Sequence, residues 1–197
     1  MSSTRQAPPP HAEASPAPVR RRTEVSVAML FLLATAAFAT GDSLLDRSPA
    51  LGVALQALTG LAVLGTGFLL LPVLRPHSDR RARGYLLARA AECTAIWACG
   101  AWLLVVGSVV GSYTLIVYAV SGVAGVLLTS VLWESGLVPR WLAGFGILGY
   151  LSLLLGTVLD ALGLVDLATA SGVVFLAPGG LFEIGFPVLL LVRGFRR

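Results

Sequence analysis

Two carboxylates and one guanidinium lie in segments of the sequence whose other residues are almost all apolar. Arg89 and Glu92 are one helical turn apart in one segment, and Glu183 lies in another, just after Pro178-Gly179-Gly180. Charged groups at membrane depth are costly, so they are usually paired, turned toward the protein interior, or functional. This trio is therefore the candidate site. The chemistry that it offers is proton exchange or cation binding at a carboxyl group, or charge pairing between helices.

The composition indicates that these charges belong to a membrane protein. The 197 residues are 56% hydrophobic and only 12% charged, about half the charged fraction of a soluble domain. Several apolar segments approach or exceed the roughly 20 residues that a helix needs to cross a bilayer. We expect an all-α, polytopic membrane helix bundle in the cell (inner or plasma) membrane, with the lipid bilayer as its partner.

Six apolar segments follow an N-terminal stretch rich in Pro and Ala. Residues 1–23 cannot bury a core, so we expect a disordered cytoplasmic tail, and residues 24–197 should form a six-helix transmembrane domain. The predicted helices are Val25–Leu45, Leu51–Leu74, Tyr85–Val110, Ser112–Trp133, Trp141–Leu164 and Ser171–Phe195. The first also resembles a signal peptide with a cleavage site at Ala37-Phe38-Ala39, but its short apolar core, followed by Asp42, favours a retained helix.

The distribution of Arg residues predicts the orientation in the membrane. All 14 basic residues are Arg. With the N-terminus inside, nearly all of them fall on the cytoplasmic side, whereas Arg47 falls outside and Arg89 lies within a helix. Because basic residues are enriched in cytoplasmic loops, we expect six transmembrane helices with both the N- and C-termini in the cytoplasm. The net charge of +4 therefore reflects topology, and we expect no nucleic-acid partner.

The sequence lacks the residues that several kinds of enzyme require. Without Lys there is no Schiff-base chemistry. His11 and His77 fall in the tail and in a loop, which disfavours a His-ligated zinc or haem site in the membrane. Cys93 and Cys99 are about 9 Å apart along one predicted helix, too far for a disulfide. We therefore predict no catalytic residue, no metal and no cofactor, and we favour a non-enzymatic protein.

Small residues form stripes along three of the predicted helices. Such residues let helix backbones approach closely in lipid, so packing is the main interpretation. The alternative is a polar cavity lined by Gln56, Tyr118 and Asp160, which lie in these stripes. The stripes comprise Gly52, Gln56 and Gly60; Tyr118, Ser121, Gly122, Gly125 and Thr129; and Gly149, Ser152, Gly156, Asp160 and Gly163.

The depths of the charged trio match across two helices. Measured from the cytoplasmic face at 1.5 Å per residue, Arg89 lies about 8 Å deep, Glu92 about 12 Å and Glu183 roughly 15 Å. The two carboxylates would meet if the third and sixth helices were neighbours. Two carboxylates that share one guanidinium in a low dielectric favour protonation of one of them. Such a carboxyl group can relay protons, bind a cation, or join two helices as a hydrogen-bond donor.

Pro178-Gly179-Gly180 has two interpretations. Pro removes a backbone donor and Gly loosens a helix, so the sixth helix can break or kink here, as helices do at the binding sites of many transporters. A half-helix that began at Gly180 would place Glu183 in its first turn, where the helix dipole favours negative charge. Alternatively, Pro178 is simply the first residue of the helix.

Three pieces of the sequence resemble the domain of unknown function 4386 family of bacterial integral membrane proteins. They are Arg89-Ala90-Ala91-Glu92, the stretch from Gly136 to Gly144, and Leu181-Phe182-Glu183-Ile184 followed by Leu189 to Phe195. The resemblance implies a multi-helix membrane protein without an assigned reaction. It also implies that Arg89, Glu92, Pro139, Arg140, Trp141 and Glu183 are pattern positions of the family. Arg140 and Trp141 also suit an interfacial anchor.

These observations favour two functions. The first is a non-enzymatic structural or regulatory membrane protein, in which Arg89, Glu92 and Glu183 form an intramembrane clasp between helices. The alternative is a small transporter or ligand-binding bundle that uses Glu92 and Glu183 as proton or cation sites. An intramembrane enzyme acting on lipid is the weakest hypothesis, because no nucleophile pair is present. The small ligand, a homo-oligomer and another membrane partner all stay open.

Overall fold

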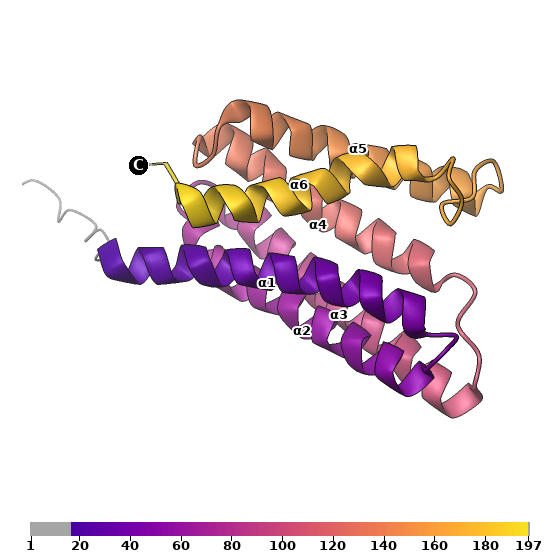
Figure 1. The fold of residues 1–197 in the computed structure, drawn as a ribbon. Coiled ribbons are helices and arrows are strands. Elements are labelled where there is room, and N and C mark those ends of the chain that lie inside the picture. Colours follow the sequence, from indigo (N-terminus) through magenta and orange to yellow (C-terminus); the bar gives the residue numbers. More distant parts are fainter. Residues whose placement is uncertain (1–16, 197) are drawn as a thin grey trace, which may run out of the picture.

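The computed structural model describes residues 17–196, with side chains from residue 21 onward, and six α-helices make up most of this part of the chain (Figure 1). All six are long and apolar enough to cross a membrane, and residues 17–196 contain no strand. The predicted all-α polytopic bundle is therefore confirmed. The helices are α1 (Ala17–Leu44), α2 (Pro49–Leu74), α3 (Asp79–Val106), α4 (Tyr113–Ser135), α5 (Arg140–Ala161) and α6 (Val173–Val192).

Helix α1 begins earlier than the sequence predicted. Residues 17–23 were expected to belong to a disordered tail, but the helix starts at Ala17; residues 1–16 lie outside the described residues. The added turns have partners in α6, because the Arg21 guanidinium donates hydrogen bonds to the carbonyls of Leu190, at 2.7 Å, and Leu191. These carbonyls lie in the last turn of α6, where backbone acceptors have no intrahelical partner.

Helix α3 also begins before its apolar segment. The hydropathy pattern predicted a start at Tyr85, whereas the helix starts at Asp79. The Ser78 hydroxyl accepts a hydrogen bond from the backbone N–H of Arg81, as an N-cap residue does. Asp79 forms ion pairs with Arg75 at 2.8 Å and with Arg83 at 2.9 Å. The polar first turns of α3 thus lie at the membrane edge, where hydropathy gives no signal.

The six helices form a closed ring in sequence order. Each helix packs against the next along the chain, and α6 packs against α1 to complete the ring. Helices α3 and α6 are not among the pairs that pack extensively and lie on opposite sides of the ring. Short connections make each consecutive pair antiparallel. The first and last helical residues therefore lie at the same end of the bundle (Figure 1).

Small residues allow the close approach of α4, α5 and α6. A Cβ atom on Gly149 would lie 2.8 Å from the backbone nitrogen of Gly179, and one on Gly122 would lie 2.7 Å from the Leu154 side chain. The aromatic ring of Tyr150 covers Gly125 in the same way. These contacts agree with the packing interpretation of the small-residue stripes.

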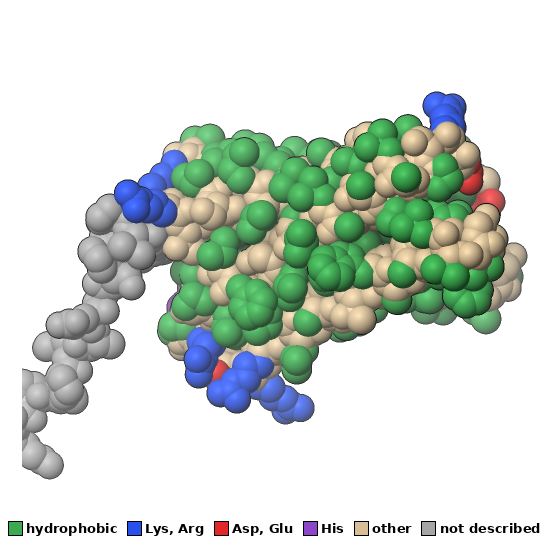
Figure 2. All heavy atoms as spheres, turned by 90° about the horizontal axis from the view of Figure 1, so that it is seen from below, with side chains coloured by type: hydrophobic (Ala, Val, Ile, Leu, Met, Phe, Trp, Pro, Cys, Tyr) green, Lys and Arg blue, Asp and Glu red, His purple; other side chains and the backbone are tan. Residues whose placement is uncertain are grey.

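The end of the bundle that contains both helical termini is packed with apolar side chains. Phe186 lies between Phe31 and Phe182, with ring centroids at 5.3 and 5.4 Å, and Phe195 lies 6.4 Å from it. We call these four rings the aromatic plug. Figure 2 shows Arg side chains gathered at the same end of the molecule, next to a broad apolar surface. The positive-inside pattern thus marks this end as the predicted cytoplasmic face.

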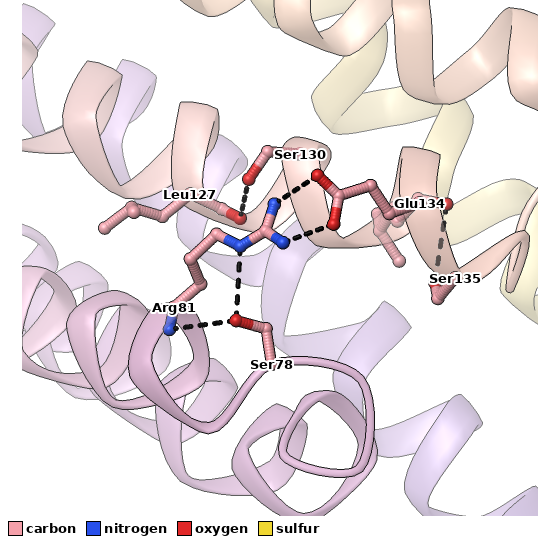
Figure 3. Close-up of polar contacts among 7 residues, drawn as sticks. Ser78, Arg81, Leu127, Ser130, Glu134 and Ser135 are labelled. Atoms are coloured by element: carbon pink, nitrogen blue, oxygen red, sulfur yellow. Dashed lines mark hydrogen bonds and ion pairs between the residues drawn. The ribbon is translucent and has the colours of Figure 1, made fainter.

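An ion pair at this end links α3 to α4 (Figure 3). The Arg81 guanidinium forms two parallel hydrogen bonds with the Glu134 carboxylate, one of them at 2.8 Å. The Ser78 hydroxyl also accepts a bond from Arg81 Nε at 3.2 Å. Both charged side chains are partly exposed, so this pair fixes the geometry of the helix ends without removing charge from water.

Candidate functional site

A cavity of about 200 Å³ lies inside the ring. Every helix contributes to its wall, which is possible only because the ring closes. The charged trio lies on the wall, together with hydroxyl groups and a larger number of apolar side chains. The wall includes Phe31, Thr35 and Phe38 from α1, Thr66 from α2, Arg89 and Glu92 from α3, Tyr118 from α4, Tyr150 and Leu153 from α5, and Leu176, Gly179, Gly180 and Glu183 from α6.

Arg89 and Glu92 form a buried ion pair on one face of α3. The guanidinium Nη1 donates to Glu92 Oε2 at 2.7 Å, and the two residues are 2% and 4% exposed. The i,i+3 spacing places the two side chains one turn apart on the same face. Removing one partner of such a pair leaves an uncompensated charge in a low dielectric.

Aromatic and hydroxyl groups complete the surroundings of Arg89. Its Nε donates to the Tyr85 hydroxyl at 3.1 Å, and that hydroxyl lies 3.1 Å from Thr66 Oγ1 on α2. The guanidinium carbon lies 5.7 Å from the ring centroid of Phe31 and 5.3 Å from that of Tyr85, within the range of cation–π contacts. The charge of Arg89 is thus held by α3 itself, with support from α1 and α2.

Glu183 has hydrogen-bond partners but no ion pair among the described side chains. The Tyr150 hydroxyl donates to Oε1 at 3.2 Å, and Thr35 Oγ1 lies 3.4 Å from Oε2. Thr35 also lies 3.1 Å from the carbonyl oxygen of Phe31, a closer acceptor for its single proton. None of the described ion pairs includes Glu183. Its carboxyl group therefore faces the cavity without a direct ion-pair partner, and the positive charge of Arg89 acts on it from the same wall.

The structure brings the trio to one cavity but does not form the predicted clasp. Glu92 and Glu183 would have met if α3 and α6 were neighbours, and these helices lie on opposite sides of the ring. The ion-pair partner of Arg89 is Glu92 on its own helix, and Glu183 bonds to residues of α1 and α5. The expected shared guanidinium is therefore wrong, because sequential ring packing separates α3 from α6.

Only one of the three predicted polar lining residues reaches this cavity. Tyr118 lines it. Gln56 lies instead against a separate small pocket between α2, α3 and α4, which Tyr113 also lines. Asp160 accepts a hydrogen bond from the backbone N–H of Leu167 at 3.1 Å and so fixes the loop after α5. The lining predicted for Gln56 and Asp160 is wrong, because the stripes that carry them turn toward neighbouring helices and the loop.

Helix α6 runs without a break through Pro178-Gly179-Gly180. It starts at Val173, so neither the predicted break nor a helix that begins at Pro178 is present. Gly179 packs against Gly149 of α5, and a Cβ on Gly180 would meet no atom within 4 Å. The glycines therefore serve the α5–α6 contact and the open volume of the cavity, and packing against α5 holds the helix together despite Pro178.

Arg140 and Trp141 lie outside the cavity at the start of α5. Arg140 is exposed and Trp141 is 70% exposed. Their position at the basic end of the bundle suits the predicted anchor at the membrane interface. Neither residue lines the cavity.

Several polar residues of the site gave no signal in the sequence. Thr35, Tyr85 and Tyr150 are single hydroxyl residues within apolar segments, which usually bind their own helix backbone or pack as aromatics. Glu24 is 6% exposed and accepts a hydrogen bond from the backbone N–H of Phe195 at 3.1 Å. A helical-face analysis that placed Thr35 and Glu24 together with Phe31 would have detected this side of α1.

The side chains described in the structure include no group of three or more His, Cys, Asp or Glu residues that could hold a metal ion. Cys93 and Cys99 are free thiols. The chemistry of the cavity therefore depends on one ion pair, one separate carboxyl group and several hydroxyls.

The fold and the cavity define a multi-pass α-helical membrane protein with a polar site enclosed by its helices. The family model described as domain of unknown function (DUF4386) matches residues 108–194, which include α4, α5 and α6. This match confirms the resemblance to that family; it includes the stretch from Gly136 to Gly144 and all but the last residue of the C-terminal piece. No curated protein and no solved structure shows significant similarity to the chain.

Proposed function

We propose that the protein is a small ligand-binding bundle of the transporter type, in which Glu183 exchanges a proton or a cation within the cavity. We place it in the cell membrane with its Arg-rich end in the cytoplasm. The observation that carries this proposal is the carboxyl group of Glu183, which faces the cavity and has hydroxyl partners but no direct ion pair among the described residues. The ionised form of such a group is costly unless a cation binds to it.

The charges of the cavity support exchange at Glu183 and not at Glu92. Arg89 and Glu92 form a direct ion pair at 2.7 Å, which leaves Glu183 as the carboxyl group on the wall without one. With Glu183 ionised, the cavity has a net charge of −1. A proton or one cation removes that charge. A proton and a cation can therefore replace each other at Glu183, and such exchange is what a proton- or cation-coupled carrier requires.

The structural alternative has less support. A clasp between α3 and α6 needs a direct bond between the charges of those helices, and the bonds of Glu183 go to α1 and α5. Packing of Gly149 against Gly179 already holds α5 to α6. A purely structural role also does not explain the cavity, since protein interiors are close-packed and have few voids larger than a water molecule.

Infrared difference spectroscopy of the purified protein in detergent tests this proposal. The protonated carboxyl band should change with pH, and Glu183→Gln should abolish the change. Glu134→Gln is a control, because Glu134 lies outside the cavity at the partly exposed end of α4. Glu92→Gln distinguishes the two buried carboxylates, and the pH-dependent change assigned to Glu183 should persist in this variant.

Two results would contradict the proposal. One is a Glu183 carboxyl band of constant intensity over the whole pH range in which the protein stays folded, without any response to added cations. The other is a titrating band that persists in Glu183→Gln and disappears in Glu92→Gln. The first would support a structural role for Glu183, and the second would assign the exchange to α3.

A further inference from the structure

We propose that the ligand of the cavity is a small organic cation, with an ammonium group at Glu183 and an apolar body against the aromatic wall. This inference rests on the proposed function and specifies its ligand. The size of the cavity, the balance of its charges and the distribution of polar and apolar groups on its wall support a ligand of this kind.

The cavity is large enough for an organic molecule. Its volume of about 200 Å³ exceeds the roughly 150 Å³ of an engineered protein cavity that binds benzene. A proton or a bare metal ion needs far less space. The open position beside Gly180, where no atom lies within 4 Å of a Cβ, adds room one turn from Glu183.

The charges favour a cationic ligand over an anionic one. The guanidinium of Arg89 is engaged by Glu92 at 2.7 Å and by Tyr85 at 3.1 Å, so an anion would have to displace a buried carboxylate. Glu183 has an unpaired charge and is held in place by Tyr150 at 3.2 Å. A protonated amine would both neutralise this charge and donate hydrogen bonds to it.

The wall fits an organic cation better than a metal ion. Ca²⁺ binds six to eight oxygen atoms, and Mg²⁺ requires an octahedral set. The described residues provide no metal-binding cluster, and Glu183 is the only unpaired carboxyl group on the wall. The remaining wall is mostly apolar and includes the rings of Phe38 and Tyr118, whose centroids lie 6.0 Å apart. Aromatic faces attract ammonium groups and pack against apolar bodies.

A matched series of small probes tests this inference. Binding of benzylamine, benzyl alcohol and benzoate to the purified full chain in detergent is measured by thermal shift and by calorimetry, at a pH where the amine is protonated. Specific binding to the folded state raises the melting temperature. We expect benzylamine to bind at least about tenfold more tightly than benzyl alcohol, the effect of one charged hydrogen bond. Benzoate should not bind.

Three variants locate the binding. Glu183→Gln should reduce the affinity for benzylamine to that for benzyl alcohol, because only the charged contact is lost. Gly180→Val should weaken binding of both probes, because its side chain occupies part of the cavity one turn from Glu183. Gly185→Val is the matched control on the same helix, since Gly185 lies outside the cavity wall and a Cβ there meets Leu142 at an ordinary 3.7 Å. Detergent micelles without protein measure probe uptake by the micelle alone.

The results separate this inference from the proposed function. Equal affinity for benzylamine and benzyl alcohol would overturn the proposal that the ligand is an organic cation. Tighter binding of benzoate than of benzylamine would overturn it as well. Failure of benzylamine and of smaller alkylamines to bind at all would overturn it as well. The infrared titration of Glu183 can still succeed in each of these cases. If the titration fails and benzylamine binds in a Glu183-dependent way, proton exchange is wrong and the cation site stands.

Discussion

The Tyr150 hydroxyl on α5 donates a hydrogen bond to Oε1 of Glu183 on α6 at 3.2 Å, inside a ring of six membrane-spanning helices. The ring of Tyr150 also covers Gly125 of α4 and lies 5.7 Å from the ring of Phe182. One side chain thus connects three helices and orients the carboxyl group that faces the cavity. This contact relates the packing of small residues to the polar site.

We predict that Tyr150→Phe destabilises the protein by about 1 kcal/mol, the net value of one buried hydrogen bond. The aromatic ring and its packing on Gly125 are kept, so only the bond to Glu183 is lost. The measurement is unfolding of the purified protein in detergent. Tyr118→Phe is the control, because Tyr118 lines the same cavity and donates no bond to Glu183. Equal stability of the two variants would show that the Tyr150 bond contributes nothing.

Arg89→Ala should lower the free energy of unfolding by about 3–5 kcal/mol, far more than Tyr150→Phe, because it leaves the Glu92 carboxylate buried without its partner. The double variant Arg89→Ala/Glu92→Gln removes the charge as well and should recover part of that loss. Melting temperatures of the three proteins in detergent provide the comparison. If the double variant melts below Arg89→Ala, the ion pair is not the cause of the loss.

The ion pair between Arg81 and Glu134 should behave differently. Arg81→Ala is expected to lower the melting temperature much less than Arg89→Ala, because the guanidinium is 30% exposed and Glu134 is 59% exposed. Exposed ion pairs contribute little and are screened by salt. The measurement is the melting temperature at low and at high salt. A loss as large as that of Arg89→Ala, unaffected by salt, would contradict this view.

Two glycine substitutions should have opposite effects. Gly149→Ala places a Cβ 2.8 Å from the backbone of α6, and overpacking of this kind typically costs about 1–3 kcal/mol. Gly180→Ala meets no atom within 4 Å and replaces a poor helix former, so stability should stay the same or rise by up to roughly 1 kcal/mol. Unfolding in detergent compares the two. A destabilised Gly180→Ala would indicate that the site needs backbone freedom there.

The orientation is tested by fusing a reporter after the last residue. Green fluorescent protein should be fluorescent, and alkaline phosphatase should be inactive, because the basic end of the bundle is predicted to be cytoplasmic. Fusion of the same reporters at Arg47, in the loop after α1, should give the opposite pattern. Active phosphatase at the C-terminus would reverse the assignment of the two faces and place the aromatic plug on the outer side of the cavity.

Hydropathy and Arg placement alone predicted the class of the fold. A stretch of about 20 apolar residues has few options other than a membrane-spanning helix, since each backbone polar group must be satisfied internally. Four of the six predicted helices begin within about two residues of the observed starts; α1 and α3 begin earlier, in polar turns that hydropathy does not detect. The sequence also singled out Arg89, Glu92 and Glu183, because charges in such segments are rare.

The partners of those charges depended on the tertiary structure. Spacing along α3 predicted the Arg89–Glu92 pair, because i and i+3 share a helix face in any fold. The bonds of Glu183 to Tyr150 and Thr35 join residues far apart in sequence, and they exist because α6 closes the ring against α5 and α1. Depth alone suggested that Glu92 and Glu183 meet; ring closure instead set them on opposite helices around one cavity. Helix formation is local and can be predicted from composition, whereas the order of helices around a bundle depends on packing between side chains that are distant in sequence.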